Sequence, residues 1–160
     1  MKKIKYLVLF LVGFCVYITI EVCFRCYSYP LMGVCGGLLL LLLDPLNDKV
    51  FGWDTDLFLQ GIIGSAIVTL MELVIGKTYQ YFNLTPMWDY SNIPLNYDGI
   101  ICLPFSLIWI GLSIVGVLLI DTINYYVFKQ LPTPYYKMFG KTIIQFKDYD
   151  YLKETRQKSH

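Results

Sequence analysis

The residues best placed to do chemistry are the ionisable groups that interrupt long apolar stretches of the 160-residue sequence, namely Glu21, Arg25 and Glu72. A charged side chain near the centre of a membrane helix costs about 2.5–3.5 kcal/mol, so each such group needs a partner or a function. Glu21 precedes Arg25 by four positions, which is the favourable order for an ion pair along one helix face. Such a pair either orients the end of the helix or contacts a ligand.

Glu72 has no oppositely charged residue three or four positions away. It is therefore expected either to stay protonated or to meet a cation from another helix, and Arg25 is the natural candidate. A protonated carboxyl in this position could hydrogen-bond a polar ligand or take part in proton movement. Lys77, five positions further on, is expected to extend its amino group to the membrane surface.

The segment 88–99 combines aromatic rings with small polar side chains. Aromatic residues favour the membrane interface, whereas Asp, Ser and Asn can hydrogen-bond either their own backbone or a ligand. The segment is therefore either an interfacial anchor or a lid above the three ionisable residues. The candidate ligand-binding or ion-pair cluster comprises Glu21, Arg25, Glu72, Trp88, Asp89, Tyr90 and Asn96.

The usual catalytic motifs of soluble enzymes are absent from the sequence. It has no GxxxxGK[ST] phosphate loop and no GxSxG nucleophile elbow, and with His160 as its one histidine it has no HExxH metal motif. The five cysteines lie in or beside apolar runs, and the Cys23–Cys26 pair lacks the histidines or second pair of a metal site. We therefore expect no metal, no cofactor and no nucleic-acid partner, and no catalytic residue can be assigned.

Composition indicates what kind of elements must position these residues. The chain is 56% hydrophobic and 16% charged, and its mean hydropathy of +0.53 is typical of a membrane protein. At roughly 20 residues per span it has material for about four membrane helices, which leaves no room for an ATPase domain. The apolar runs predict spans at about residues 6–24, 28–43, 57–82 and 100–120.

Two of these spans need separate arguments. The first follows three lysines, as a signal peptide would, but its roughly 19 apolar residues exceed the about 7–15 of a signal core and no small-residue cleavage site follows, so we predict that it is not cleaved. The second has an apolar run of only 13 residues, 31–43. It crosses a membrane only if it extends back over residues 28–30, with Pro30 tolerated in its first turn.

Positive charges decide the orientation, because the cytoplasmic flanks of membrane helices are enriched in Lys and Arg. With four spans and the N-terminus inside, six such residues lie on the inner flanks and two on the outer flanks, whereas three spans give four against four. We therefore predict an all-α, four-transmembrane-helix bundle in residues 1–121 with both termini cytoplasmic. Residues 122–160 are predicted to form a short cytoplasmic tail, rich in tyrosine and lysine, that either lies along the anionic inner leaflet or is simply solvated.

Small residues recur at a spacing of four within two of the predicted spans. These pairs are Gly33 with Gly37 and Gly61 with Ser65. Small residues at this spacing let helix backbones approach each other closely in lipid, although glycine is also common in membrane helices generally. The pattern favours a packed bundle over separated spans.

The most distinctive block of the sequence runs through residues 88–109. It contains Trp88-Asp89-Tyr90-Ser91, then Pro94, Asn96 and Gly99, and then Ile101-Cys102-Leu103-Pro104-Phe105-Ser106-Leu107-Ile108-Trp109. This block resembles the signature of the Putative ABC-transporter type IV family of small bacterial membrane proteins. The resemblance covers about residues 10–120 through Glu21, Arg25, the segment 29–33, Glu72 and Gly76, and it leaves out the tail after Asp121.

The resemblance implies a multi-pass protein of the bacterial cytoplasmic membrane. Because this sequence has no ATPase domain, any ATP-driven pumping would require a separate ATPase subunit. Four spans are also few for a complete pore, so a homo-oligomer or partner subunits are expected.

Three functions fit these observations. The leading hypothesis is a permease-like or accessory component of a transport system that binds a polar or amphiphilic ligand in an outward-facing chamber in the outer half of the membrane. Glu21, Arg25 and Glu72 would form the floor of this chamber. Its lid would consist of Trp88, Asp89, Tyr90 and Asn96. The alternatives are a membrane enzyme acting on a lipid or isoprenoid head group, with the acidic side chains at positions 72 and 89 as acid and base, and a non-catalytic membrane scaffold.

Overall fold

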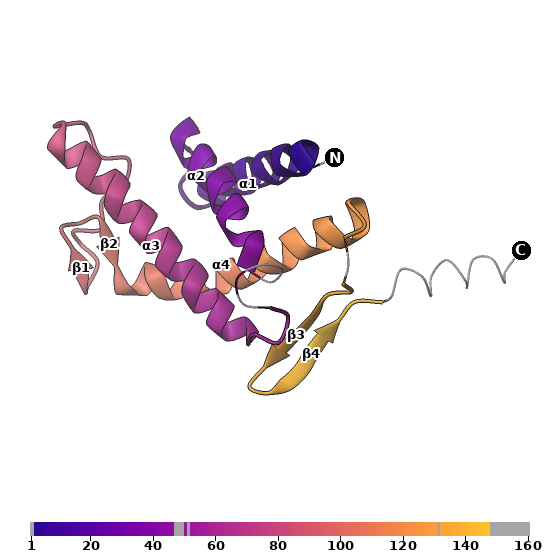
Figure 1. Cartoon of the computed structure of the whole chain (residues 1–160). Coiled ribbons are helices and arrows are strands. Elements are labelled where there is room, and N and C mark those ends of the chain that lie inside the picture. The colour runs from indigo at the N-terminus through magenta and orange to yellow at the C-terminus, as the bar shows by residue number, and fades with distance from the viewer. Residues whose placement is uncertain (1, 47–49, 51, 131, 148–160) are drawn as a thin grey trace, which may run out of the picture.

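The chain folds mainly into helices, and the computed structural model describes residues 2–46, 50, 52–130 and 132–147 (Figure 1). The helices are α1 (Lys2–Arg25), α2 (Pro30–Leu43), α3 (Leu57–Tyr81) and α4 (Leu103–Thr122), and α4 continues into a π-helical turn, η2 (Ile123–Val127). Two antiparallel hairpins pair β1 (Asn96–Tyr97) with β2 (Ile101–Cys102) and β3 (Tyr135–Met138) with β4 (Lys141–Gln145).

The first turns of three helices have recognisable sequence signals. Pro30 lies at the start of α2, where its missing N–H removes no helical hydrogen bond. Asp56 precedes α3, and its carboxylate accepts a hydrogen bond from the backbone N–H of Phe58 at 2.9 Å. Pro104 lies in the first turn of α4, directly after β2. These signals fix where each helix begins relative to the loops that carry the candidate site.

Three of the described helices, within Lys3–Arg25, Leu57–Tyr81 and Leu103–Val127, are long and apolar enough to cross a membrane. The fourth, α2, has 14 residues and therefore spans about 21 Å at about 1.5 Å per residue, against about 30 Å for a bilayer core. The predicted count of four helices is met, with three of span length, and the crossing of the membrane by the short α2 stays a prediction. The chain is a helical membrane protein.

Helices α1 and α2 pack through their glycines. A Cβ atom added at Gly36 would lie 2.6 Å from the carbonyl oxygen of Gly13, so the two backbones meet at this point. Gly33 lies against the ring of Phe14, and Gly37 against that of Phe10. The close approach predicted from the Gly33 and Gly37 spacing is therefore confirmed.

Helices α3 and α4 cross each other, as Figure 1 shows, and also meet through small residues. Gly61 lies against Ile114, and the hydroxyl of Ser65 donates a hydrogen bond to the backbone carbonyl of Ser106. The hydroxyls of Thr69 and Ser106 are 3.1 Å apart. The hydroxyls of Ser65, Thr69 and Ser106 therefore bond within this apolar pair of helices, whereas the buried hydroxyl of Ser113 has no hydrogen-bond partner.

A buried polar network holds together one end of the molecule, which we call the Lys5 end. Lys5 near the start of α1 forms an ion pair with Asp44 at the end of α2, with Nζ and Oδ1 2.8 Å apart. Asn124 in η2 donates to the same oxygen at 2.8 Å, and Lys5 also donates to Gln130 at 3.2 Å. Both members of the ion pair are at least 94% buried. The network brings the start of α1, the end of α2 and the end of α4 together.

The opposite end, which we call the Arg25 end, joins the end of α1 to the segment after α3. Arg25 donates a hydrogen bond to the backbone carbonyl of Met87 at 3.1 Å. In Figure 1 the β1–β2 hairpin lies on the left, whereas the N-terminus and, below it, the β3–β4 hairpin lie near the middle of the view. Successive helices therefore run in alternating directions between the Lys5 end and the Arg25 end.

The expectation of an all-α chain is wrong for residues 135–145, which form the β3–β4 hairpin. Pro132 and Pro134 prevent α4 from continuing, and Phe139 and Gly140 have φ values of 50° and 78°. Two consecutive residues with positive φ form the tight turn that joins short antiparallel strands. The predicted tail therefore contains an ordered hairpin between residues 135 and 145, and its residues from 148 onward lie outside the described part of the chain.

The hairpin packs against the loop before α3. Tyr136 is 99% buried, and its hydroxyl donates to the carboxylate of Asp121 at 2.7 Å. Lys137 forms an ion pair with Asp54, and the Tyr135 hydroxyl donates to the same carboxylate, so these bonds hold the pKa of Asp54 below its usual value. The core at this end consists of Leu9, Leu40, Leu43, Leu46, Leu57, Val117, Ile120 and Tyr136.

Candidate functional site

The segment between α3 and α4 holds itself in shape through its own polar residues. Asp89 accepts a hydrogen bond from the backbone N–H of Ser91 at 2.8 Å and another from its hydroxyl. Asn96 donates to the carbonyl of Ile93 at 2.7 Å and accepts from the N–H of Gly99 at 3.1 Å. The side chains at positions 89 and 96 thus use part of their hydrogen-bonding capacity to build the loop.

Gly99 occupies a position that requires glycine. Its φ is +66°, and a Cβ atom there would lie 2.5 Å from the hydroxyl oxygen of Ser91 and 2.8 Å from a carboxylate oxygen of Asp89. The Gly99 carbonyl accepts a hydrogen bond from the N–H of Tyr90 at 2.8 Å. These contacts bring residues 89–91 against residue 99 and close the loop.

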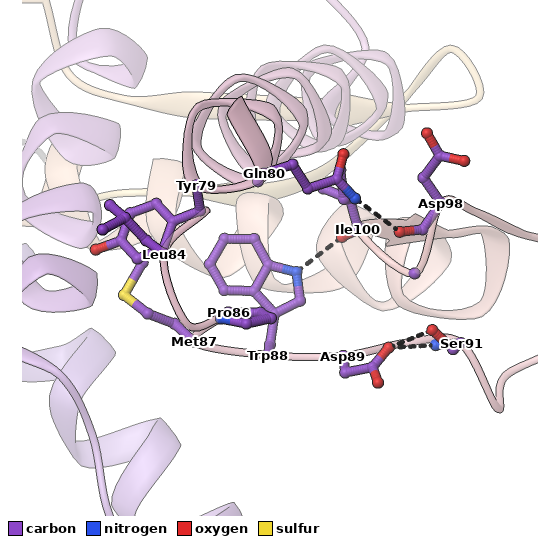
Figure 2. Close-up of a pocket in the computed structure, with 12 residues that line it drawn as sticks. Tyr79, Gln80, Leu84, Pro86, Met87, Trp88, Asp89, Ser91, Asp98 and Ile100 are labelled. Atoms are coloured by element: carbon purple, nitrogen blue, oxygen red, sulfur yellow. Dashed lines mark hydrogen bonds between the residues drawn. The ribbon is translucent and has the colours of Figure 1, made fainter. Parts of the chain in front are cut away.

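A pocket of about 220 Å³ lies between this loop and the last turns of α3 (Figure 2). The indole of Trp88 lies in the middle of the view, and its N–H donates to the carbonyl of Ile100 at 2.8 Å. Gly76 makes room where α3 meets Ile100, since a Cβ atom there would lie 2.2 Å from the isoleucine side chain. The lining residues are Gly76, Tyr79, Gln80, Leu84, Pro86, Met87, Trp88, Asp89, Ser91, Asp98, Gly99 and Ile100.

Two ionisable side chains in the wall of the pocket are carboxylates. Asp98 forms an ion pair with Lys77 of α3, and its backbone carbonyl accepts a hydrogen bond from Gln80. Asp89 has hydroxyl and amide donors in Ser91, which hold the pKa of its carboxyl below the usual value. Asp89 is therefore ionised at neutral pH.

Glu72 lies deeper in the molecule, where it is 95% buried on α3. Its Oε1 accepts a hydrogen bond from the indole N–H of Trp109 on α4 at 3.2 Å and one from the Tyr90 hydroxyl at 3.4 Å. Tyr17 of α1 stacks on Trp109, with the ring centroids 6.0 Å apart. Aromatic side chains from three parts of the chain therefore surround the deep carboxyl group of α3, and two of them donate hydrogen bonds to it.

Tyr90 connects this carboxyl group to the loop. Its ring stacks on Phe105 of α4 at a centroid distance of 4.8 Å. Burial, followed by the proximity of Glu72, raises the pKa of the Tyr90 hydroxyl above its usual value. The hydroxyl is therefore neutral at all physiological pH values and acts as a donor to Glu72.

Arg25 forms no ion pair with Glu72, so of the two alternatives predicted for Glu72 the pairing with this arginine is not the one found. Its guanidinium pairs with Glu21, as the spacing of four predicted, and also donates to the backbone at Met87. The ring of Tyr27 lies 4.9 Å from the guanidinium, and Ser28 donates to the second oxygen of Glu21. Arg25 thus has partners on α1, in the turn after it and in the segment after α3, while its buried Nε has no hydrogen-bond partner. Neutral donors bond Glu72.

Trp88 separates the pocket from a second, smaller cavity of about 20 Å³. This cavity is lined by Glu72, Tyr17 and Cys35 among others, and Trp88 lines it as well as the pocket. A volume of about 10–15 Å³ already admits one water molecule, provided that polar partners are present. The cavity therefore has room for about one water beside the carboxyl group of Glu72.

The structure divides the seven predicted site residues into four groups. Trp88 and Asp89 line the pocket, Tyr90 contacts Glu72 below it, and the Glu21–Arg25 pair lies beside the loop. Asn96 shapes the loop without lining the pocket. Sequence reasoning missed the roles of Tyr17, Tyr79, Gln80, Asp98 and Trp109.

A sequence signal existed for part of what was missed. Tyr17 precedes Glu21 by four positions and so lies on the same face of α1, and Gln80 follows Gly76 by four positions on α3.

Among the described residues, no group of three His, Cys, Asp or Glu side chains is placed to hold a metal ion.

The fold and site define a helical membrane protein with a small pocket, rimmed by aromatic and acidic residues, at one end of its helices. The family model described as Putative ABC-transporter type IV matches residues 1–153, so the chain belongs to that family. The match includes the β3–β4 hairpin, which corrects the expectation that the resemblance ends near residue 120. No curated protein and no solved structure matches the chain.

Proposed function

We propose that this protein is a permease-like or accessory membrane component of an ABC transport system and that it binds a polar or amphiphilic ligand in the pocket at its Arg25 end. The single observation that carries the proposal is the pocket of about 220 Å³ that Trp88 and Asp89 help to line. Membership of the family supports the association with transport. The bacterial cytoplasmic membrane is the proposed location.

The proposed orientation places the Arg25 end outside and the Lys5 end in the cytoplasm. The pairing of Lys5 with Asp44 supports it, because α2 returns to the end of the molecule at which α1 begins. Four crossings put six Lys residues on the inner flanks and two basic residues on the outer flanks. Since α2 spans about 21 Å, the bilayer beside it must be locally thin.

Reporter fusions test this orientation. A fluorescent protein fused after His160 is expected to fluoresce, and alkaline phosphatase at the same place is expected to be inactive, because the C-terminus stays in the cytoplasm. Phosphatase fused after Asn92, in the segment between α3 and α4, should be active and serves as the control. An active phosphatase after His160 would contradict a four-span topology with both termini inside.

The proposed partner is a separate ATPase subunit, because the helices and hairpins of the described residues include no nucleotide-binding domain. The Lys5 end, with its ordered hairpin, is the part that we propose to face such a subunit. A homo-oligomer is a further proposal, since a pore built from these helices would need more than one copy.

Co-purification tests the partner. The full-length protein, extracted in mild detergent from its native membrane, is expected to retain an ATPase subunit that mass spectrometry identifies. Extraction of an unrelated four-span protein from the same membrane is the control for nonspecific capture. Recovery of the protein without any ATPase would contradict a role as a transport component and leave the scaffold as the better proposal.

A membrane enzyme is the less favoured candidate. An acid and a base must reach the same substrate, and Asp89 lines the pocket whereas Glu72 lines the cavity beyond Trp88. The two carboxyl groups therefore do not share one cavity. We propose no catalytic residue.

A further inference from the structure

The pocket at the Arg25 end has a definite electrostatic character. Among the described residues that line it, those with an acidic or basic charged side chain are Asp89 and Asp98. The wall therefore presents two carboxylates and no ammonium or guanidinium group.

The nearby cations are already paired. Lys77 neutralises Asp98, and Arg25 pairs with Glu21 while also donating to the carbonyl of Met87. Asp89 has Ser91 as its hydrogen-bond donor, and serine carries no charge. One negative charge thus stays uncompensated at the pocket wall, and the low pKa of Asp89 keeps it ionised.

Aromatic rings form the other part of the wall. The indole of Trp88 and the ring of Tyr79 both line the pocket, and Figure 2 shows the indole in its middle with Asp89 next to it along the chain. A cation placed over an aromatic face gains about 0.5–1 kcal/mol at exposed sites and about 2 kcal/mol or more when it is desolvated, and tryptophan is the best such ring. An anion in the same place would meet the negative face of the ring and a carboxylate.

We propose that this pocket selects a small organic ammonium ion, with Asp89 as its counter-ion and the face of Trp88 as its platform. The inference rests on the proposed function, which assigns a ligand to this pocket without naming its class. The volume of about 220 Å³ sets the size, because drug-sized ligands occupy pockets of about 300–1,000 Å³. A single ammonium head group with a short substituent fits this limit.

Isothermal titration of the purified full-length protein in nanodiscs tests the inference with choline as the probe. Its neutral isostere 3,3-dimethylbutan-1-ol replaces the ammonium nitrogen by carbon and keeps the shape. Acetate serves as a small anion. We expect choline to bind at least about tenfold more tightly than the isostere and acetate not to bind.

Two variants assign the selectivity to named residues. Asp89→Asn keeps an oxygen that can accept from Ser91 but removes the charge, and it should weaken choline binding at least about tenfold while leaving the isostere unaffected. Trp88→Leu should reduce the preference for choline over the isostere. Asp54→Asn, which removes an exposed and hydrogen-bonded aspartate at the Lys5 end, is the matched control and should bind choline like the unmodified protein.

Each outcome bears on a different proposal. Equal binding of choline and its isostere, or unchanged choline binding by Asp89→Asn, would overturn the ammonium selectivity. Binding of acetate alone would overturn it too, while leaving a ligand-binding pocket in place. No heat from any probe, together with co-purification of an ATPase, would also overturn the selectivity and leave the role as a transport component intact.

Discussion

Replacement of Gly36 by leucine is expected to separate α1 from α2. Even a Cβ atom at this position would lie 2.4 Å from the Cβ of Tyr17 and 2.6 Å from the carbonyl oxygen of Gly13. The second of these atoms belongs to the backbone, so no side-chain rotation can relieve the overlap. Overpacking typically costs about 1–3 kcal/mol, and we expect the Gly36→Leu variant to reach or exceed the upper value because a helix axis must move.

Unfolding by SDS in mixed micelles measures this change, and Gly111→Leu is its control. Gly111 lies on α4 with no atom within 4 Å of an added Cβ, so the same substitution there should leave the unfolding midpoint unchanged. Because Tyr17 also stacks on Trp109, the Gly36 variant should in addition alter tryptophan fluorescence. Equal stability of the two variants would show that α1 and α2 do not pack through this contact.

Replacement of Lys5 by methionine has the second large expected effect. The substitution leaves Asp44 buried with Asn124 as its described hydrogen-bond donor and without its counter-charge. Removal of one partner of a buried ion pair typically destabilises a protein by about 3–5 kcal/mol. The same SDS titration at neutral pH should therefore show a large loss in the free energy of unfolding.

A double-mutant cycle separates the charge effect from the loss of packing. Lys5→Met combined with Asp44→Leu removes both charges, and this variant should recover most of the lost stability, because an apolar pair can replace a buried ion pair at little cost. The exposed pair of Lys137 and Asp54 is the control, and Asp54→Asn should produce no measurable change, since solvent screens such pairs. Additive effects of the two single substitutions at the Lys5 end would contradict a direct interaction there.

The parts of this fold that follow from position along one helix could be predicted from the sequence. The apolar runs gave the four helices, and a spacing of four gave both the Glu21–Arg25 pair and the small residues at the helix contacts. Such relations need only the geometry of a single helix, in which residues four apart share a face. They hold whatever the neighbouring helices do.

Contacts between helices could not be predicted in the same way, because they depend on how each helix is rotated and on the angle at which it crosses its neighbour. Glu72 accepts hydrogen bonds from Trp109 of α4 and from Tyr90 of the loop, and it does not pair with the arginine that charge alone favoured. Lys5 and Asp44 were visible only as the flanks of two apolar runs. Their pairing depends on the return of α2 along α1.

The candidate site, too, could be predicted only where its residues lie in one segment of the sequence. The segment 88–99 stood out by composition, and Trp88 and Asp89 do line the pocket. The remaining wall comes from the last turns of α3, where Tyr79 and Gln80 have no composition that distinguishes them from other residues near a helix end. The hairpin of residues 135–145 was missed because its turn depends on two consecutive residues with positive φ, of which only Gly140 is typical.

Because Trp88 lines both cavities, a ligand that moved its side chain would link the occupancy of the two cavities thermodynamically. Any ligand that moves this side chain changes the space left beside Glu72, and so changes the free energy of a water molecule there. Linkage is reciprocal, so hydration of the smaller cavity must change the affinity of the larger one by the same factor. Through this one side chain, ligand binding in the pocket would then change the hydration of the buried Glu72.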